Sequence, residues 1–377
     1  NPFDPDMASM IHNEMRKHGI KLVLGYTVEG FREKDNGVEI LLKDNPSLQA
    51  DMVVLAIGVT PDTALAKEAG LELGIKGSIV VNDRMETSVP DIYAAGDAVQ
   101  VKHYVTGDDA LISLAGPANK QGRIIADNIC GGDSHYLGSQ GSSVIKVFDM
   151  TAATTGINET NAKKSGLEVD TVILSPMSHA GYYPGGKVMT MKVVFEKETY
   201  RLLGAQIIGY EGVDKRIDVL ATAIHAGLKA TQLKDLDLAY APPYSSAKDP
   251  VNMAGFMIDN IAKGTLKQWH LEDMDKISKD KNVVLLDVRT VGEFNRGHMK
   301  GFNNIPVDEL RERISEIEKG KPVYLICQSG LRSYIASRIL EGNGYETYNF
   351  SGGFRFYDTV VNDRALIERA YACGMDY

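Results

Sequence analysis

The chain has few cysteines and no long apolar run, and both features limit the classes of protein to which it can belong. Its three cysteines, Cys130, Cys327 and Cys373, are widely spaced and odd in number, which argues against a disulfide framework or a zinc site. No apolar stretch approaches the length of a membrane-spanning helix, and the first residues form neither a basic nor an apolar signal region. We therefore expect a soluble, cytoplasmic protein without a metal site.

Positive charge is also scarce. Lys and Arg number 41 against 50 Asp and Glu, which gives a formal net charge of −9, and there is no basic run. We therefore expect no nucleic-acid partner, and an anionic ligand must be held by Lys or Arg placed locally. At 377 residues the chain is too long for one typical core, so about two to four domains are expected.

Cys327 stands at the end of an apolar run and opens a glycine-containing turn. Pro322–Ile326 predicts a buried strand, and Cys327-Gln328-Ser329-Gly330-Leu331-Arg332 leads from it into a helix. The backbone N–H groups of such a turn and the positive end of the helix stabilise a thiolate. The alternative is a buried, inert cysteine. The glycine and the arginine favour an anion cradle over that alternative. Cys130 follows a predicted helix, where we expect packing, and Cys373 is assigned no role.

The residues around this loop resemble the rhodanese family of sulfurtransferases. The matching segments, between roughly Asp275 and Tyr357, are Val283–Arg289, Glu293-Phe294, Gly297-His298, Gly301–Pro306, the cysteine loop and Ser351–Phe354. The resemblance implies that Cys327 carries a persulfide and that Asp287 and Arg289 brace the loop. It also implies that the loop holds the substrate sulfur, through Gln328, Ser329, Gly330 and Leu331.

Loop length separates two chemistries that this fold supports. Related phosphatases place one residue more between cysteine and arginine, to fit a tetrahedral phosphate, whereas four residues lie between Cys327 and Arg332. The shorter loop suits a single sulfur atom, so sulfur transfer is favoured over phosphate ester hydrolysis. We expect Arg332 to help hold the loop and its anionic substrate.

The N-terminal part reads as a mixture of helices and strands. A helix is predicted over Asp4–His18 with Asp4 as its cap. Strands are predicted over Lys21–Leu24, Thr27–Glu33 and Val38–Leu42, the last two joined by a hairpin turn at Asp35-Asn36-Gly37. Met52–Gly58 is continuously apolar, which predicts a buried strand of a parallel sheet. Its end at Gly58 is where nucleotides are usually received.

A second short strand is predicted just before Gly96-Asp97, and a helix is predicted over Ala118–Ile129. Gly96 permits a close approach, and an exposed Asp97 carboxylate can accept hydrogen bonds from sugar-like hydroxyls. A lone Gly-Asp is more often an ordinary turn. The order of these pieces, however, resembles the flavin-dependent pyridine nucleotide-disulfide oxidoreductases. That resemblance implies FAD and NAD(P)H as cofactors, with Gly58, Gly96, Asp97 and Ala118 at the cofactor and Asp97 on the flavin ribityl chain.

Residues 142–264 have a different pattern, which resembles the dimerisation domain of the same oxidoreductases and implies a homodimer. The predicted strands are Ser143–Phe148, Thr171–Leu174, Val188–Glu196 and Leu202–Gly209, followed by helices near Asp214–Ala226 and Ala230–Lys234.

Two tyrosine motifs, Tyr182-Tyr183-Pro184-Gly185 and Tyr240-Ala241-Pro242-Pro243-Tyr244, resemble those of the coenzyme A-disulfide reductases. By that resemblance Tyr182 and Tyr240 reach across the dimer toward the partner's flavin and sulfur centre, while Asn119 and Lys248 contact coenzyme A. The alternative is two aromatic-proline turns that pack a domain.

Neither copy of the Gly-x-Gly-x-x-Gly fingerprint of such reductases occurs in the chain, and no cysteine precedes Cys130. We therefore expect the C-terminal portion of a longer protein; the alternative is a natural form that has kept only the scaffold. The expected fold is α/β and α+β multidomain. It comprises parts of the NAD(P)H-binding (1–83) and FAD-binding (84–141) domains of a flavoprotein, an α+β dimerisation domain (142–264), and a linker with an α/β rhodanese domain (265–377).

The predicted activity is FAD- and NAD(P)H-dependent reduction of coenzyme A disulfide, persulfide or polysulfide sulfur, coupled to sulfur transfer through a Cys327 persulfide. The alternative is a stand-alone rhodanese sulfurtransferase on a non-catalytic dimeric scaffold.

Overall fold

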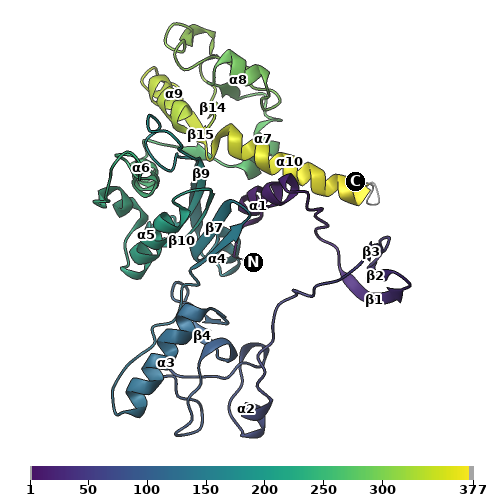
Figure 1. Cartoon of the computed structure of the whole chain (residues 1–377). Helices are drawn as coiled ribbons and strands as arrows, with labels where there is room; N and C mark the ends of the chain where they lie inside the picture. Colours follow the sequence, from purple (N-terminus) through teal and green to yellow (C-terminus); the bar gives the residue numbers. More distant parts are fainter. Residues whose placement is uncertain (1, 373–377) are drawn as a thin grey trace. The chain divides into compact units, whose positions relative to one another are not determined.

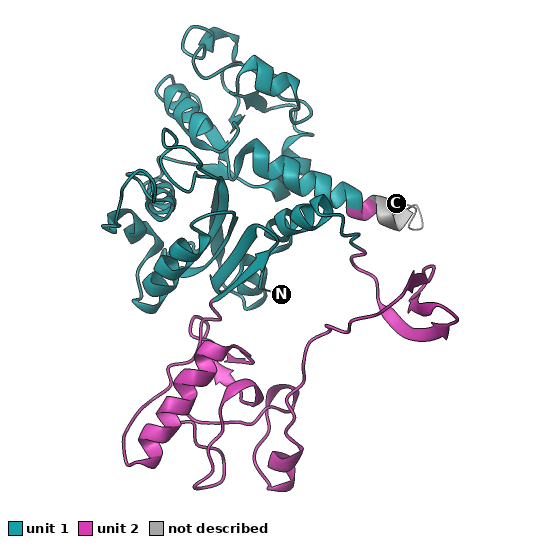
Figure 2. Cartoon of the chain, in the orientation of Figure 1, with its two compact units in different colours: residues 1–22, 143–366 teal, residues 23–142, 367–377 magenta. Residues whose placement is uncertain are grey.

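The computed structural model describes residues 2–372, so Cys373 lies outside the described residues. The chain divides into two compact units, shown in different colours in Figure 2. The first contains residues 1–22 and 143–366, and the second contains residues 23–142 and 367–377. Helices, antiparallel sheets and one parallel sheet follow one another along the described residues, which confirms the expected α/β and α+β character (Figure 1).

The first unit contains a five-stranded antiparallel sheet in the order β6-β7-β10-β9-β8. Its strands are β6 Ser143–Val147, β7 Met150–Gly156, β8 Val169–Leu174, β9 Met189–Glu196 and β10 Leu202–Gly209. The central strands β9 and β10 are almost wholly buried, because helices α1 (Pro5–Lys17) and α5 (Val213–His225) both pack against β10 and β7. Helices α4 (Glu159–Lys164) and α6 (Pro250–Ala262) and the 3₁₀ helix η3 (Ala230–Asp235) complete this part.

Helix α1 is fastened to this sheet by a buried charge cluster. The Lys192 side chain on β9 is 2% exposed, and its Nζ lies 3.2, 2.8 and 2.7 Å from carboxylate oxygens of Asp4, Asp6 and Glu159. Burial opposes the charge on Lys192, but the three carboxylates outweigh it and raise the pKa of Lys192. Asp4 stands at the N-cap position of α1, as the sequence predicted, but its side chain makes no capping hydrogen bond to that helix. Its carboxylate accepts from the backbone N–H groups of Glu159 and Thr160.

The same unit carries a second, parallel sheet in the order β11-β15-β14-β12-β13. Its strands are β11 Gln268–Trp269, β12 Val284–Asp287, β13 Asn303–Asn304, β14 Val323–Ile326 and β15 Thr347–Phe350. The helices with it are α7 Met274–Ile277, α8 Val291–Asn295, α9 Leu331–Glu341 and α10 Gly353–Ala372. Parallel strands bring their carboxyl ends to one edge of the sheet, and that edge receives the loop after β14.

The two sheets of this unit share packing and hydrogen bonds. Met7 of α1, Ile208 of β10 and Phe356 of α10 belong to one buried apolar cluster. The Ile173 backbone N–H on β8 donates to the Ser351 hydroxyl at 3.0 Å. Ser351 therefore fastens the antiparallel sheet to the segment that follows β15.

The second unit contains the three-stranded antiparallel sheet β1-β2-β3 (Val28–Lys34, Gly37–Leu42 and Leu48–Ala50). The predicted hairpin is confirmed, because Lys34 pairs with Gly37 across the turn. Helices α2 (Ala64–Glu68) and α3 (Ala115–Ile129), the short strands β4 (Val101–Lys102) and β5 (Asp109–Ala110), and the 3₁₀ turns η1 (Ile75–Gly77) and η2 (Gly96–Ala98) complete it. Cys130 is exposed after α3, so the expected packing role was wrong.

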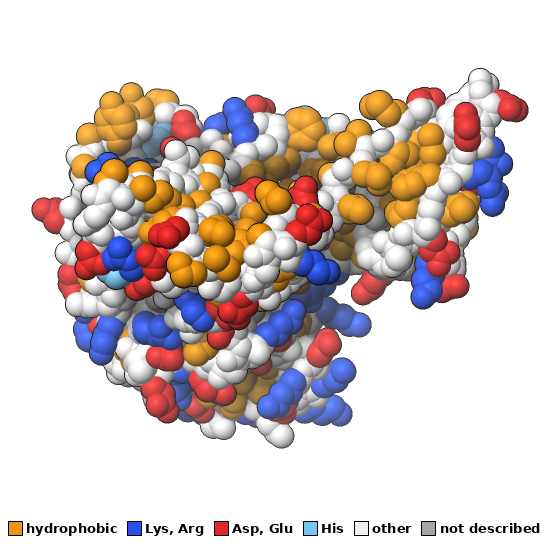
Figure 3. Space-filling model, turned by 90° about the horizontal axis from the view of Figure 1, so that it is seen from below, with side chains coloured by type: hydrophobic (Ala, Val, Ile, Leu, Met, Phe, Trp, Pro, Cys, Tyr) orange, Lys and Arg blue, Asp and Glu red, His pale blue; other side chains and the backbone are white. Residues whose placement is uncertain are grey.

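Three predicted strands of the N-terminal part are not formed. Residues 52–58 make no strand, and their large apolar side chains are exposed, Ile57 by 88%. The run has the composition of a buried parallel strand, but no strand among residues 2–372 pairs with it, so it has neither ladder nor cover. Residues 21–24 form no strand either, and residues 92–95 form only an isolated bridge between Tyr93 and Glu86. On the face drawn in Figure 3, hydrophobic side chains gather in patches at the surface.

Within residues 2–372, none of the helices is long and apolar enough to cross a membrane. A search of the same residues finds no group of His, Cys, Asp and Glu side chains that could hold a metal ion.

Candidate functional site

Cys327 lies at the carboxyl end of β14, directly before the loop that leads into α9. It is 1% exposed, and its Sγ accepts hydrogen bonds from the Gly330 backbone N–H at 3.1 Å and from the Ser333 hydroxyl at 3.2 Å. Gly330 stands at the N-cap of α9 with φ +98°, a backbone conformation that favours glycine. Two hydrogen-bond donors at the N-terminal end of α9 therefore point at the sulfur.

Ser333 was missed in the sequence, although it lies one residue beyond the predicted loop. It is buried on the first turn of α9, and its hydroxyl lies 3.1 Å from the Gly330 carbonyl oxygen as well as 3.2 Å from the sulfur. A hydroxyl has one proton, so it donates to only one of these acceptors at a time. Its place on the face of α9 turned toward the cysteine becomes apparent only in the folded structure.

Arg289 braces the loop from the neighbouring strand. Its guanidinium binds the Asp287 carboxylate through Nε and Nη2 at 2.9 and 2.6 Å, and both side chains are buried. Nη1 reaches the Gln328 side-chain oxygen at 3.4 Å, and Nη2 reaches the Gly297 carbonyl at 2.8 Å. The same guanidinium lies 3.8 Å from the Phe354 ring centroid. Arg289 is therefore neutralised and fixed in place before any substrate arrives.

Arg332 points at a carboxylate rather than at the sulfur. Its Nη1 and Nη2 each lie 2.7 Å from one oxygen of Glu293 on α8, a bidentate pair. Glu293 also closes a capping box with Thr290 at the start of α8. The hydrogen bonds from Arg332 lower the pKa of Glu293 to about 2. Arg332 thus joins the start of α9 to α8, and its expected contact with the substrate stays a prediction.

The segment after β15 supports the loop from behind. The Phe354 N–H donates to the Cys327 carbonyl at 2.8 Å, and the Arg355 N–H donates to the Gln328 carbonyl at 3.2 Å. Gly353 has φ +73°, and a Cβ there would lie 2.7 Å from the Gln328 carbonyl oxygen. A glycine is therefore required for this close approach. On β15, Asn349 donates from its side-chain amide to the Gly330 carbonyl at 3.2 Å.

The two tyrosine motifs come together in the first unit. The hydroxyls of Tyr182 and Tyr240 share a hydrogen bond of 2.7 Å, although the side chains are 76% and 44% exposed. This hydrogen bond raises the pKa of Tyr240. A cavity of about 720 Å³ lies beside Tyr240, lined among others by His179, Lys215 and Tyr244. One of the two hydroxyl protons is used in this hydrogen bond, so the pair can still donate one proton at the surface.

Lys248 is exposed in the same unit, with its Nζ 6.0 Å from the Phe256 ring centroid. The structure gives it no other fixed partner among the described residues, so its side chain is free to meet a ligand.

The other predicted ligand residues lie in the second unit. Gly96 has φ +79°, and a Cβ there would lie 3.8 Å from the Ala118 side chain, so the η2 turn approaches α3 closely. The Asp97 side chain is exposed. Asn119 donates to the Ala115 carbonyl within α3 at 2.9 Å. Gly58 has φ +96° and lies in the exposed segment described above.

Comparisons with known proteins match three parts of the chain. Residues 1–122 match the pyridine nucleotide-disulphide oxidoreductase family, residues 142–250 match its dimerisation domain, and residues 270–358 match the rhodanese-like domain. The NAD(P)H sulfur oxidoreductase (CoA-dependent) of Pyrococcus abyssi is 37% identical over 249 residues, 66% of this chain and 55% of that protein. The coenzyme A disulfide reductase of Staphylococcus aureus (strain JH9) is 35% identical over 256 residues, covering 67% and 57%.

Two solved structures are similar over almost the whole chain. Reduced CoADR-RHD of Bacillus anthracis superposes with a TM-score of 0.93 at 46% identity, covering 96% of this chain and 65% of that one. The NAD-dependent persulfide reductase of A. fulgidus gives a TM-score of 0.87 at 40% identity, covering 94% and 64%. The chain therefore spans little more than half the length of the curated relatives that it matches.

Proposed function

Because the chain belongs to the pyridine nucleotide-disulphide oxidoreductases that carry a rhodanese-like domain, we propose that it serves reduction of sulfur bound to coenzyme A, coupled to sulfur transfer through Cys327. The proposed substrates are coenzyme A disulfide, persulfide or polysulfide sulfur, and the proposed electron donor is NADH or NADPH. The observation that carries the proposal is the Cys327 sulfur with two hydrogen-bond donors, Gly330 and Ser333.

Sulfur transfer at Cys327 needs only bond exchange between sulfur atoms. The Cys327 thiolate attacks the outer sulfur of a persulfide R–S–SH, the S–S bond of the donor breaks, and the thiolate R–S⁻ leaves. The products are a Cys327 persulfide and the donor thiolate, so charge and atoms balance without an added oxidant. The Gly330 N–H and the Ser333 hydroxyl stabilise the Cys327 thiolate before it attacks. They stabilise it again when an acceptor takes the outer sulfur and Cys327 is released as a thiolate.

FAD is the cofactor of this proposal, and the residues present fit it. The exposed Asp97 carboxylate makes no hydrogen bond within the described part of the chain, and Gly96 lets the turn approach α3 closely. Gly58, Gly96, Asp97 and Ala118 are the residues that would hold FAD and the nicotinamide cofactor. When bound, FAD carries electrons from NAD(P)H to the sulfur centre.

The dimerisation domain supports a homodimer through residues 142–264. We propose that Tyr182 and Tyr240 face the partner's sulfur centre, where their joined hydroxyls can donate a hydrogen bond to a thiolate. Asn119 and Lys248 are proposed to contact coenzyme A, because an exposed amide and an exposed ammonium suit its polar groups.

A stand-alone rhodanese sulfurtransferase remains the second candidate. One observation favours it: every hydrogen bond described around the Cys327 loop comes from residues 287–355, so this site is complete within the chain.

Two measurements on the purified chain test the proposal. The first is single-turnover sulfur transfer from a persulfide donor by the native chain and by Cys327→Ser. We expect the variant to lose transfer completely, since a hydroxyl cannot carry the persulfide; transfer near the native rate would remove Cys327 from the mechanism. The second is the visible absorption spectrum after desalting. A retained flavin band supports the reductase, and its absence together with Cys327-dependent transfer supports the stand-alone sulfurtransferase.

A further inference from the structure

A polar pocket of about 340 Å³ opens beside the cysteine loop. Its lining residues come from the α8 region, the loop itself and the start of α10: Arg289, Glu293, Arg296, Gly297, Gln328, Phe354 and Arg355. Gln328 directly follows Cys327, and its carbonyl accepts the Arg355 N–H at 3.2 Å. The pocket therefore shares a wall with the sulfur-carrying loop.

The charges around this pocket do not cancel. Asp287 neutralises Arg289, and Arg332 neutralises Glu293 in a bidentate pair. Arg296 and Arg355 are both exposed. Neither guanidinium has a hydrogen-bond or ion-pair partner among the residues that the structure describes. Two uncompensated arginines thus face one pocket in a chain whose formal net charge is −9.

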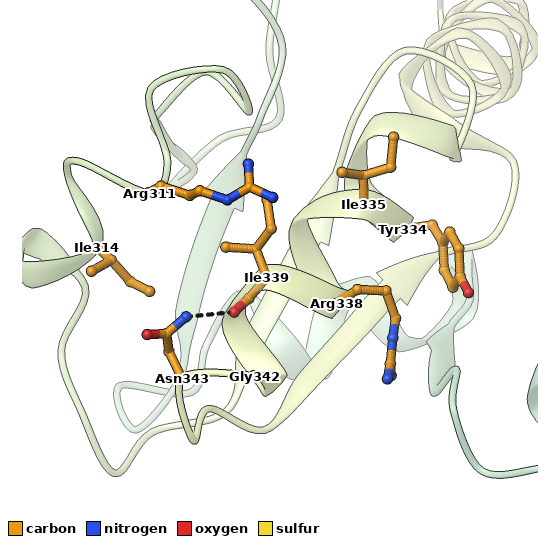
Figure 4. A pocket seen from close by; sticks show the side chains of 8 residues that line it. All are labelled: Arg311, Ile314, Tyr334, Ile335, Arg338, Ile339, Gly342 and Asn343. Carbon is orange, nitrogen blue, oxygen red and sulfur yellow. Dashed lines mark hydrogen bonds between the residues drawn. The ribbon is translucent and has the colours of Figure 1, made fainter.

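A second pocket of the same domain shows a different lining. It measures about 560 Å³ and lies between residues 311–314 and α9, with Ile314, Ile335 and Ile339 on its walls (Figure 4). Its Arg338 is already paired with Glu341 and donates to the Thr265 carbonyl at 2.9 Å. This pocket is largely apolar, and Arg311 is the one lining arginine without a partner among the described residues. It therefore lacks the two uncompensated arginines of the pocket at the loop.

We propose that Arg296 and Arg355 bind the phosphate groups of the thiol that exchanges sulfur with Cys327. The inference rests on the proposed role of Cys327 as the sulfur carrier. Guanidinium groups match phosphate oxygens through two parallel N–H donors, and two of them on the wall of one pocket suit a ligand with more than one phosphate. The pocket volume is in the range that holds an organic ligand rather than one small anion.

The reaction assigned to this pocket is transfer between the Cys327 persulfide and a phosphate-bearing thiol of the coenzyme A type. The thiolate R–S⁻ attacks the outer sulfur of Cys327–S–SH, the S–S bond breaks, and R–S–SH and the Cys327 thiolate result. Arg296 and Arg355 take no part in bond making. They select the thiol by its phosphates and hold it with its sulfur end at the loop.

The test compares coenzyme A with pantetheine, which has the same thiol arm but no phosphate. Cys327 is first loaded with sulfane sulfur from thiosulfate, with release of sulfite, and excess reagent is removed. Each thiol is then added, and loss of the persulfide from the Cys327 peptide is followed by mass spectrometry. We expect the second-order rate constant for coenzyme A to exceed that for pantetheine about tenfold, from two partly exposed charge pairs.

The double variant Arg296→Ala/Arg355→Ala should bring this rate ratio close to one while pantetheine reacts at its native rate. Its matched control is Arg311→Ala/Arg364→Ala, which removes the same charge from exposed positions outside the pocket and should keep the ratio. Raised ionic strength should lower the native ratio toward one. An unchanged ratio in the Arg296/Arg355 variant overturns the inference. Failure of Cys327 to load with either donor, thiosulfate or a persulfide, overturns instead the proposed function beneath it.

Discussion

The pair between Arg332 and Glu293 is a measurable link between the cysteine loop and α8. The Glu293 carboxylate has a pKa of about 2, against an ordinary value of 4.5, chiefly because Arg332 donates two hydrogen bonds of 2.7 Å to it. A shift of this size corresponds to roughly 3 kcal/mol at most. Both side chains are partly exposed, so solvent screening reduces the expected coupling to about 1–2 kcal/mol.

The assay is a double-mutant cycle with Glu293→Gln, Arg332→Ala and the double variant. The free energy of unfolding is measured by urea titration at pH 7, with the transition of the first unit followed through Trp269 fluorescence. The coupling energy should be about 1–2 kcal/mol, because each single variant leaves its partner without a counter-charge.

The pH dependence of this coupling has a defined sign. The pKa of Glu293 is lower in the folded than in the unfolded chain, so the stabilisation is fully present above about pH 4.5. It is lost as the pH falls toward about 2. The same double-mutant cycle at pH 3.5 should therefore give a smaller coupling energy than at pH 7. A coupling near zero at pH 7, or one that does not weaken in acid, would refute the reasoning.

Three further variants test other parts of the structure. Ser333→Ala should slow sulfur transfer about tenfold through loss of one hydrogen bond to a charged sulfur, measured by single-turnover kinetics; equal slowing in Ser337→Ala, a buried serine one turn further along α9, would contradict a direct role. Gly353→Ala should lower the free energy of unfolding by roughly 1–3 kcal/mol more than its control, Gly344→Ala. Gly344 also has a positive φ, but it has open space for a Cβ. Equal urea midpoints for the two variants would mean that the close approach of Gly353 to Gln328 is unimportant for stability. Lys192→Met should lower the free energy of unfolding by about 3–5 kcal/mol, since three carboxylates lose their buried cation. Lys163→Met, at an exposed ion pair, should lower it by less than about 1 kcal/mol. Equal losses of stability in a thermal or urea scan would rule out the charge cluster as a stabilising element.

The cysteine loop could be predicted from the sequence because its signals are local. An apolar run, a cysteine, a glycine and an arginine stand within a few residues, and their order alone places the sulfur at a strand end before a helix. Ser333 adds no composition signal, so its contact with the sulfur is visible only in three dimensions. The partner of Arg332 was equally hidden, because Glu293 is 39 residues away in the chain.

The remaining differences have physical reasons of their own. β7 was missed because its sequence, Met-Thr-Ala-Ala-Thr-Thr-Gly, has no large apolar side chain after Met150, although most of it is buried. The strand expected at Met52–Gly58 was wrong because composition reports which residues suit a buried strand but not whether neighbouring strands are there to cover it. Asp4 stands at the predicted N-cap, but its carboxylate makes no capping hydrogen bond because a buried lysine far along the chain, Lys192, competes for it.

The account depends most on Cys327 as the atom that carries sulfane sulfur. The most direct measurement is mass spectrometry of the Cys327 peptide after the chain has been treated with a persulfide donor and desalted under non-reducing conditions. The account predicts a mass increase of one sulfur atom on Cys327, removed by an acceptor thiol and absent from Cys130. An unmodified Cys327, or equal labelling of the exposed Cys130, would contradict it.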